Sequence, residues 1–305
     1  MNCRTLLTAL VALALLTGCA KTYDLTFTVA EGMSNRYISE DVTITTTQAM
    51  GTDMENITTN KLTFVIDDAG VDEDNHERVK FSYEAVEYEQ SIMGNSITYS
   101  STDPSRNNNP EIARVYSSLL GQSMIMVFNP NGEILDVEGV EEIMNSMFES
   151  LPDEYRATME EQFGGESLVS AMKSMTNYYP EKGKVKIGDT WSVTNEFALG
   201  GMEMIIDSNF RLVEVKDGLA KLAFDGEVTS NPEAPGLNLM GMQMQFDLQG
   251  TQQGTLYIDA NTRWLESMEV DQQFDGFMNM NSEQTGPMKL DMAVESQQLI
   301  RKITP

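Results

Sequence analysis

Cysteine and histidine, two residue types common in catalytic and metal-binding sites, are scarce in this sequence. Among 305 residues there are two cysteines, Cys3 and Cys19, and one histidine, His76. A single histidine in an expected loop argues against a Ser-His-Asp hydrolase and against a histidine-rich zinc site. The 47 acidic residues would always offer a carboxylate pair, so such pairs say nothing about a glycosidase site. We therefore expect a protein that is not an enzyme and has no cofactor.

An acidic connector at residues 67–77 surrounds the histidine. Its side chains make a metal site conceivable, but the spacing lacks the glycine and the terminal glutamate of a calcium-binding loop. A charged hairpin tip is the interpretation that we prefer, and we expect no metal site.

The stretch before Cys19 has the order of an export signal. Arg4 precedes an apolar run from Leu6 to Leu16, which as a helix would rise about 16 Å, against the roughly 30 Å of a bilayer core. The run is therefore a signal-peptide core and not a membrane span. It ends in Leu16-Thr17-Gly18-Cys19, which resembles the bacterial lipobox.

That resemblance implies that residues 1–18 are removed and that Cys19 carries lipid. Several acyl chains, at about 0.8 kcal/mol per buried CH₂, give stable anchoring to a membrane. Ala20 follows the cysteine, and by resemblance to enterobacterial sorting rules this position implies the outer membrane of a bacterial cell envelope. The alternative is an ordinary secretory signal with an incidental cysteine.

The composition restricts the partners of the processed chain. Loss of residues 1–18 removes one basic residue, Arg4, so the formal net charge changes from −27 to −28. Such a body repels nucleic acid and anionic headgroups, and we expect no nucleic-acid partner. With Cys3 removed and Cys19 lipidated, no disulfide is possible, so the fold depends on its hydrophobic core.

Apolar alternation predicts a β-rich first half at residues 19–138. Period-two patterns rich in threonine and aromatic residues indicate strands at 25–29, 42–47, 62–66 and 81–88, the last with Phe81, Tyr83, Ala85 and Glu87 on one face. Asn109-Pro110 begins a helix over 110–120, and a hairpin follows around Asn129–Gly132. Apolar spacing of three and four predicts helices within 140–178, inside a helical insert at 139–179.

Strands return in a second half at residues 180–305. The hairpin at 258–265 resembles the one at 128–135, which suggests a degenerate duplication; chance similarity is the alternative. The lipobox, the stretch Tyr99–Asp103 and the Gly188-Asp189-Thr190-Trp191 junction together resemble an uncharacterised, Bacteroidota-type bacterial lipoprotein family, known as a domain of unknown function. The shared motifs are turn chemistry, so the resemblance implies no activity.

The least usual feature is a stripe of methionines, drawn from 22 in the chain. Alternation places Met240, Met242, Met244 and Phe246 on one face of a strand, and the same pattern recurs at Met278 and Met280 and at Met202 and Met204. Three interpretations stay open. The stripe is core, where flexible methionine fills gaps; it lines a groove for an apolar ligand; or its thioethers bind Cu(I).

The expected fold is α+β: a curved antiparallel sheet or open half-barrel, possibly of two degenerate repeats, with helices 110–120 and 140–178 packed on it. The expected function is that of a lipid-anchored envelope protein binding a hydrophobic small molecule or a protein partner. The rival is a structural or interaction subunit of an envelope complex without a ligand cavity.

Overall fold

The computed structural model describes residues 21–49, 51–148, 176–199, 202–231, 236–239, 242–282 and 286–303, together with Val169, Met172, Lys173 and Ala234. Cys19, its preceding signal and Met240 lie outside the described residues, as does most of the predicted helical stretch after residue 148.

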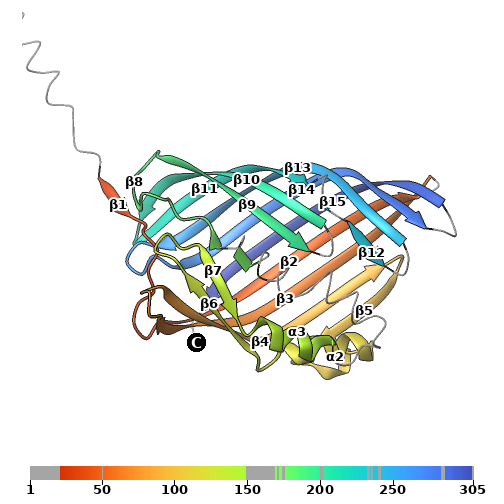
Figure 1. Ribbon diagram of the computed structural model, residues 1–305, viewed down its shortest axis with the longest axis horizontal. Coiled ribbons are helices and arrows are strands. Elements are labelled where there is room, and N and C mark those ends of the chain that lie inside the picture. Colours follow the sequence, from red (N-terminus) through yellow and green to blue (C-terminus); the bar gives the residue numbers. More distant parts are fainter. Residues whose placement is uncertain are drawn as a thin grey trace, which may run out of the picture.

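One antiparallel sheet of 13 strands forms the body of the protein (Figure 1). Its main path runs β7-β6-β4-β3-β2-β15-β14-β13-β11-β10-β9, with β5 beside β4 and β12 beside β13. Because β7 and β9 end this path without pairing to each other, the sheet is curved but not closed, which confirms the predicted fold class. A separate two-stranded ribbon pairs β1 with β8 at one end.

The strands have these bounds: β1 Thr22–Asp24, β2 Ser34–Ala49, β3 Thr52–Val71, β4 Glu77–Ile92, β5 Asn95–Ser100, β6 Ser123–Phe128, β7 Ile134–Glu138, β8 Lys184–Lys186, β9 Thr190–Leu199, β10 Met202–Lys216, β11 Leu219–Ser230, β12 Leu237–Leu239, β13 Met242–Asp259, β14 Leu265–Ser282 and β15 Gly286–Ile303.

Pairing of the last strand with the first long one joins the two predicted halves into a single sheet. β15 runs antiparallel to β2 from Asp291↔Gln48 to Ile303↔Arg36. Along β15, residues at even positions from Met288 to Ile300 are buried or half-buried, and those at odd positions are exposed. Register carries this two-sidedness from strand to strand, so the sheet has a concave inner face and a polar outer face.

Two short helices lie on the inner side, next to β4 and β5 (Figure 1). Helix α2 (Pro110–Leu119) confirms the predicted helix at 110–120, with Asn109 Oδ1 accepting from the backbone N–H of two residues in its first turn, each at 3.0 Å. Its Tyr116 ring packs on Tyr88 of β4 and Tyr99 of β5. Helix α3 (Val140–Phe148) packs against α2 and buries its apolar stripe.

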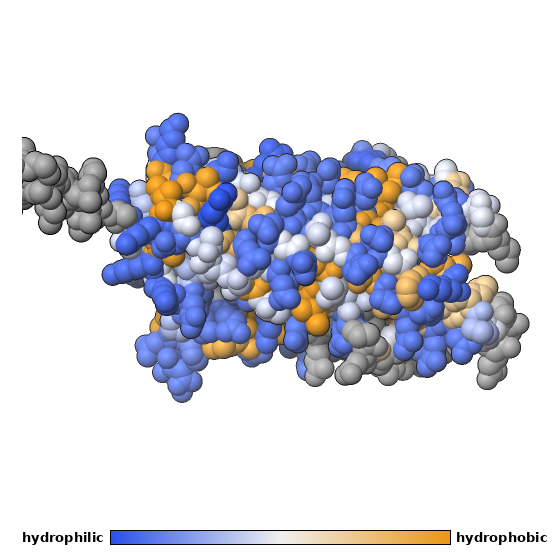
Figure 2. Space-filling view, turned by 90° about the horizontal axis from the view of Figure 1, so that it is seen from above, coloured by the Kyte–Doolittle hydropathy of each residue, from blue (hydrophilic) through white to orange (hydrophobic). Residues whose placement is uncertain are grey.

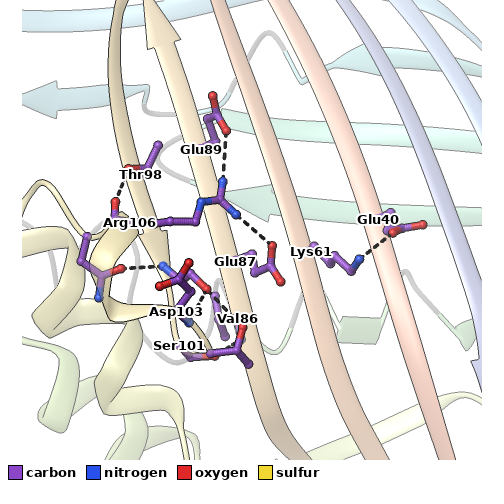
Figure 3. Close-up of polar contacts among 12 residues, drawn as sticks. Glu40, Lys61, Val86, Glu87, Glu89, Thr98, Ser101, Asp103 and Arg106 are labelled. Carbon is purple, nitrogen blue, oxygen red and sulfur yellow. Dashed lines mark hydrogen bonds and ion pairs between the residues drawn. The ribbon is translucent and has the colours of Figure 1, made fainter.

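The loop after β5 folds back on the outer face of the sheet (Figure 3). It contains the 3-10 helix η1 (Pro104–Arg106). Ser101 exchanges two hydrogen bonds with the backbone of Val86, each 2.9 Å long. The Arg106 guanidinium lies 3.4 Å from Glu87 and 3.5 Å from Glu89. These contacts show that the Tyr99–Asp103 motif anchors a turn.

The expectation of a strand at residues 25–29 was wrong. This segment follows β1 without joining the large sheet; Leu25 donates from its backbone to Gly183, 2.7 Å away. Leu25 and Phe27 are buried at 0 % and 5 % exposure. The alternation is real, but it reflects an extended segment that crosses the end of the half-barrel and inserts every second side chain into it.

The expected face shared by Phe81, Tyr83, Ala85 and Glu87 was also wrong. A β-bulge in β4 follows Tyr83, so Tyr83 pairs with Phe64 whereas Ala85 pairs with Thr63. One extra residue reverses the side of everything after it. Phe81 and Tyr83 therefore face inward, and Glu87 faces outward.

The other predicted turns are present. In the β3–β4 connector, Asp72 accepts hydrogen bonds from the backbone of Asp74 and His76, at 2.9 and 2.8 Å, and from the His76 ring at 2.9 Å. These bonds, chiefly the one from the His76 backbone, hold the pKa of Asp72 below its usual value. This confirms a hairpin tip. The hairpins at 128–135 and 258–265 are both formed, each with an Asx turn at Asn129 or Asp259.

Candidate functional site

The strand register gathers the predicted methionines on the inner face of β13, β14 and β15. Met244 lies directly across from Met280, which in turn lies across from Met288. One rung further along, Phe246 pairs with Met278, and Met278 with Leu290. All of these described side chains are half-buried, so they form neither a closed core nor a fully exposed patch. We call this group, with Met242 and Met292, the methionine strip.

The remaining predicted residues have separate positions. Met204 of β10 is buried at 4 % exposure and packs with Val228 and Leu248, against which Phe246, Phe274 and Met292 also pack. Its part of the stripe is therefore core. Met202 begins β10 opposite Leu199; only its backbone is described. Cys19 and Met240 lie outside the described residues.

The outer face of the same strands is polar. Gln243, Gln245 and Asp247 of β13 are exposed, as are Asn279 and Asn281 of β14. Seen from above, the molecule is largely hydrophilic, with separate orange patches (Figure 2). The apolar side chains of the methionine strip therefore lie on the opposite, inner face.

Glycines allow the inner face to curve. A Cβ built on Gly250 would lie 2.0 Å from the backbone oxygen of Gln273, and one on Gly276 would lie 2.0 Å from that of Asp247. At Gly254 the added atom would meet the Phe224 ring at 2.4 Å. Such close approach of neighbouring backbone and rings is open only to glycine, which marks these positions as bends in the sheet.

A cavity of about 270 Å³ lies on the inner face, midway along the strands. Apolar walls come from Phe210, Phe224, Leu256 and Val270, among others. Its polar lining consists entirely of uncharged amides and hydroxyls: Asn177, Asn195, Ser208, Gln252, Gln272 and Gln298, with the hydroxyl of Tyr178 nearby.

Three of these side chains form a connected chain of hydrogen bonds. The Gln252 amide, buried at 8 % exposure, donates to Ser208 Oγ at 2.7 Å and accepts from Gln272 Nε2 at 3.0 Å. Asn177 donates to Asn195 at 2.9 Å. Sequence reasoning missed this group. Alternation alone places Gln252 and Gln272 on the inner face, because they continue the even positions of Met242 and Met278. The predicted site was nevertheless limited to the methionines, which lie toward the ends of the strands.

A single carboxylate adjoins this amide group on the inner face. Asp41 of β2 pairs across strands with Gln298 and lies within 3.3–3.4 Å of Ser296, Thr43 and Asn60, all hydrogen-bond donors. Its environment is polar and half-buried. We call the row from Ser208 through Gln252, Gln272 and Gln298 to Asp41 the polar belt.

Beyond the polar belt, the half-barrel is filled with aromatic side chains. Phe27 stacks on Phe128 at 4.7 Å between ring centroids and contacts Tyr179 and Trp264 at 5.3 and 5.6 Å. Trp264 donates from Nε1 to the Thr28 carbonyl at 2.7 Å. Burial raises the pKa of the Tyr178 hydroxyl to about 12 and also that of Tyr179. The inner face thus has a closed aromatic end, a polar middle and a methionine-lined far end.

Thioethers are the candidate metal ligands that the register brings together in the described strands. Within the described part of the chain, no three His, Cys, Asp or Glu side chains converge as metal ligands. Directly paired Met244, Met280 and Met288 are the only arrangement of the predicted stripe in which three described thioethers share one rung. Among the described helices, none is long and apolar enough to span a membrane.

The comparisons with known proteins identify a family, but that family has no known activity. A model of a family of unknown function (DUF6263) matches residues 74–265. No curated protein matches the chain.

Solved structures give only distant likenesses. A structure described as "lipid–protein interactions in lipovitellin" is 10 % identical, with a TM-score of 0.48, over 89 % of this chain and 25 % of that one. OccK11 of Pseudomonas aeruginosa is 8 % identical, with a TM-score of 0.21, over 92 % of this chain and 100 % of that one. A DUF1329 protein of Desulfovibrio piger is 10 % identical, with a TM-score of 0.15, over 89 % and 85 %. This chain thus spans about a quarter of the lipovitellin chain.

Proposed function

Because this chain belongs to the family of unknown function DUF6263, we propose its function from its own geometry: the inner face of the half-barrel binds an elongated apolar ligand along the methionine strip. One observation carries the proposal. Apolar side chains of three adjacent strands are in register on the concave face of an unclosed sheet, are half-buried, and lead toward a cavity.

The shape of the inner face and the adaptability of its side chains both favour an apolar ligand. A concave face lined by apolar groups, with a few polar groups at one place, is the usual form of a small-molecule site. Methionine side chains are flexible and polarizable, so they repack around apolar partners of different shape. Fully burying one exposed apolar side chain contributes about 1.5–3 kcal/mol. The side chains of the strip are already half-buried, so each contributes less, and part of the gain offsets the cost of association. A ligand must therefore cover most of the strip to bind tightly.

We further propose that the protein is not an enzyme and acts at the bacterial cell envelope. Along the described inner face, the only carboxylate of the polar belt, Asp41, is held by neutral donors. The Leu16–Cys19 motif supports a lipid anchor on Cys19, and Ala20 supports the outer membrane. Replacing Cys19 by alanine should move the protein from the membrane fraction to the soluble fraction; retention in the membrane would exclude this anchor.

A matched pair of variants tests ligand binding. Met278 faces inward and its neighbour Asn279 faces outward on the same strand. Met278→Glu should weaken binding of the apolar fluorescent dye N-phenyl-1-naphthylamine tenfold or more, because it removes an apolar contact and places a charge on the strip. Asn279→Glu should leave dye affinity unchanged. Circular dichroism melting of both variants separates loss of binding from loss of folding.

Native mass spectrometry provides the second readout. Protein released from its anchor should carry co-purifying apolar molecules, and Met278→Glu should carry fewer. A mass free of ligand together with equal dye affinity of both variants would leave the strip as core, and the protein as an interaction or structural subunit.

Cu(I) is a second candidate ligand, favoured by the direct pairing of Met244, Met280 and Met288. Thioethers suit this soft ion, and adjacent strands lie about 4.8 Å apart, close enough for flexible side chains to converge on one ion. Anaerobic titration should show binding tighter than micromolar that is lost in Met280→Leu; weaker binding would exclude copper.

A further inference from the structure

The polar belt indicates which part of an amphiphilic ligand binds in the cavity. We propose that the ligand of the methionine strip is a long-chain amphiphile with a neutral, hydroxyl-bearing head group, that the head lies in the cavity at Gln272 and Gln298, and that the chain extends along the strip. This inference rests on the proposed function and gives it a ligand class and a direction.

The cavity has hydrogen-bonding groups that the described residues leave unused. Gln272 uses one N–H on Gln252, which leaves its carbonyl oxygen and second N–H for another partner. Gln298 lines the same cavity, and its amide has no hydrogen bond to any residue that the structure describes. Two amides, diagonal to each other on neighbouring strands, therefore offer donors and acceptors to the same cavity. This matches hydroxyl groups, because each hydroxyl both donates and accepts.

The charge of the residues around the cavity restricts the charge of the ligand's head group. The cavity lining described above contains no arginine, lysine or histidine, and Asp41 lies across the strand from Gln298. A carboxylate or phosphate head would lose its hydration here without a cation to replace it, and would meet a second negative charge. Burial of a charge without a partner is costly, so the belt selects against anionic amphiphiles.

The packing on either side of the cavity determines the direction in which the ligand's apolar chain extends. Toward the aromatic end the way is filled by Leu256, Ile258 and Trp264, buried at 0 %, 0 % and 5 % exposure. In the other direction the inner positions of β13 lead from Gln252 through Leu248 to Phe246, six residues or about 20 Å along the strand. Phe274, Val294 and Met292 border this path on the neighbouring strands. Leu248 on this path is itself buried, at 2 % exposure against Met204 and Val228, but Phe246, Phe274 and Met292 beside it are half-buried. An apolar chain held at its head by the belt can thus extend over these half-buried side chains toward the methionine strip.

The experiment compares three ligands that share one oleoyl or oleyl chain and differ in the head group: monooleoylglycerol, oleate and oleylamine. Each competes with the dye N-phenyl-1-naphthylamine on the full processed protein at pH 8. We expect monooleoylglycerol to bind at least tenfold more tightly than either charged ligand. Equal or tighter binding of oleate or of oleylamine would overturn the neutral head group.

Variants locate the head. Gln298→Leu should weaken monooleoylglycerol about tenfold and leave dye affinity unchanged, whereas Gln297→Leu, at an exposed outward position of the same strand, should change neither. Asp41→Asn should reduce the discrimination against oleate. Unchanged monooleoylglycerol affinity in Gln298→Leu, with dye binding intact, would refute the head site alone. Absence of dye binding in the unmodified protein would instead refute the proposed function, and this inference with it.

Discussion

The aromatic end of the half-barrel makes a quantitative prediction about Phe27. This residue belongs to no strand of the large sheet, yet it is 5 % exposed and contacts the rings of Phe128, Tyr179 and Trp264. If the segment is an integral part of the core, Phe27→Ala should cost what a large-to-small change costs in a packed core, about 3–5 kcal/mol. If the segment only rests on the surface, the cost should be below about 0.5 kcal/mol.

The magnitude follows from what surrounds the ring. Removal leaves a cavity bounded by three aromatic side chains, two of which are held by hydrogen bonds. Tyr179 donates to the Arg263 carbonyl at 2.8 Å, and Trp264 donates to Thr28 at 2.7 Å. Because these hydrogen bonds hold their rings in place, the cavity cannot collapse, and the cost should lie in the upper half of the range.

Urea unfolding, followed by tryptophan fluorescence, measures the effect. With a slope of about 3 kcal/mol per molar, the midpoint should fall by more than 1 M. Glu31→Ala is the control, because Glu31 is an exposed residue of the turn that follows this segment. A midpoint for Phe27→Ala within 0.3 M of the unmodified protein would refute the assignment of this segment to the core.

Two further predictions concern pH and curvature. Burial raises the pKa of Tyr178 to about 12, above its value of roughly 10 in the unfolded chain, so the stabilisation is fully present below pH 10 and is lost as the pH rises through 12. A shift of this size corresponds to roughly 3 kcal/mol, and Tyr178→Phe should flatten the fall in unfolding free energy between pH 10 and 12; an unchanged slope would contradict the assignment. Gly250→Ala should destabilise the protein by about 1–3 kcal/mol, since its Cβ would lie 2.0 Å from the Gln273 oxygen. Thr251→Ala, at the exposed neighbour, is the control, and equal thermal melting of the two variants would show that the bend does not require glycine.

Much of the sheet was readable from local patterns. The hairpin tips, the Asn109 cap and the inward phase of Met242 to Phe246 depend on residues close in sequence, where alternation and turn chemistry act directly. The same local signal failed at residues 25–29, because an extended segment that buries every second side chain has the same alternation whether or not its backbone pairs in a sheet.

Long-range features were beyond local patterns. Nothing near Ser296 specifies Thr43 as its cross-strand partner, although their hydroxyls lie 3.2 Å apart across 253 positions of sequence. The bulge after Tyr83 depends on how β3 and β4 adjust to each other. The polar belt could not be predicted without the strand register, because Ser208, Gln252 and Gln272 belong to three different strands and are brought together only by the pairing of these strands.

The position of the aromatic end determines where a lipid anchor on Cys19 would place the methionine strip relative to the membrane. The described chain enters the fold there, at β1, only a few residues after Cys19, while β13 begins at Met242 at the opposite end (Figure 1). Eighteen residues of strand separate the two ends, about 60 Å along β13. A body tethered through Cys19 would hold its methionine-lined mouth well out in the aqueous space, with the sealed base next to its own membrane. If the proposed anchor and the proposed ligand are both right, the ligand would be exchanged with a soluble carrier or an apposed surface, and not with the bilayer that holds the anchor.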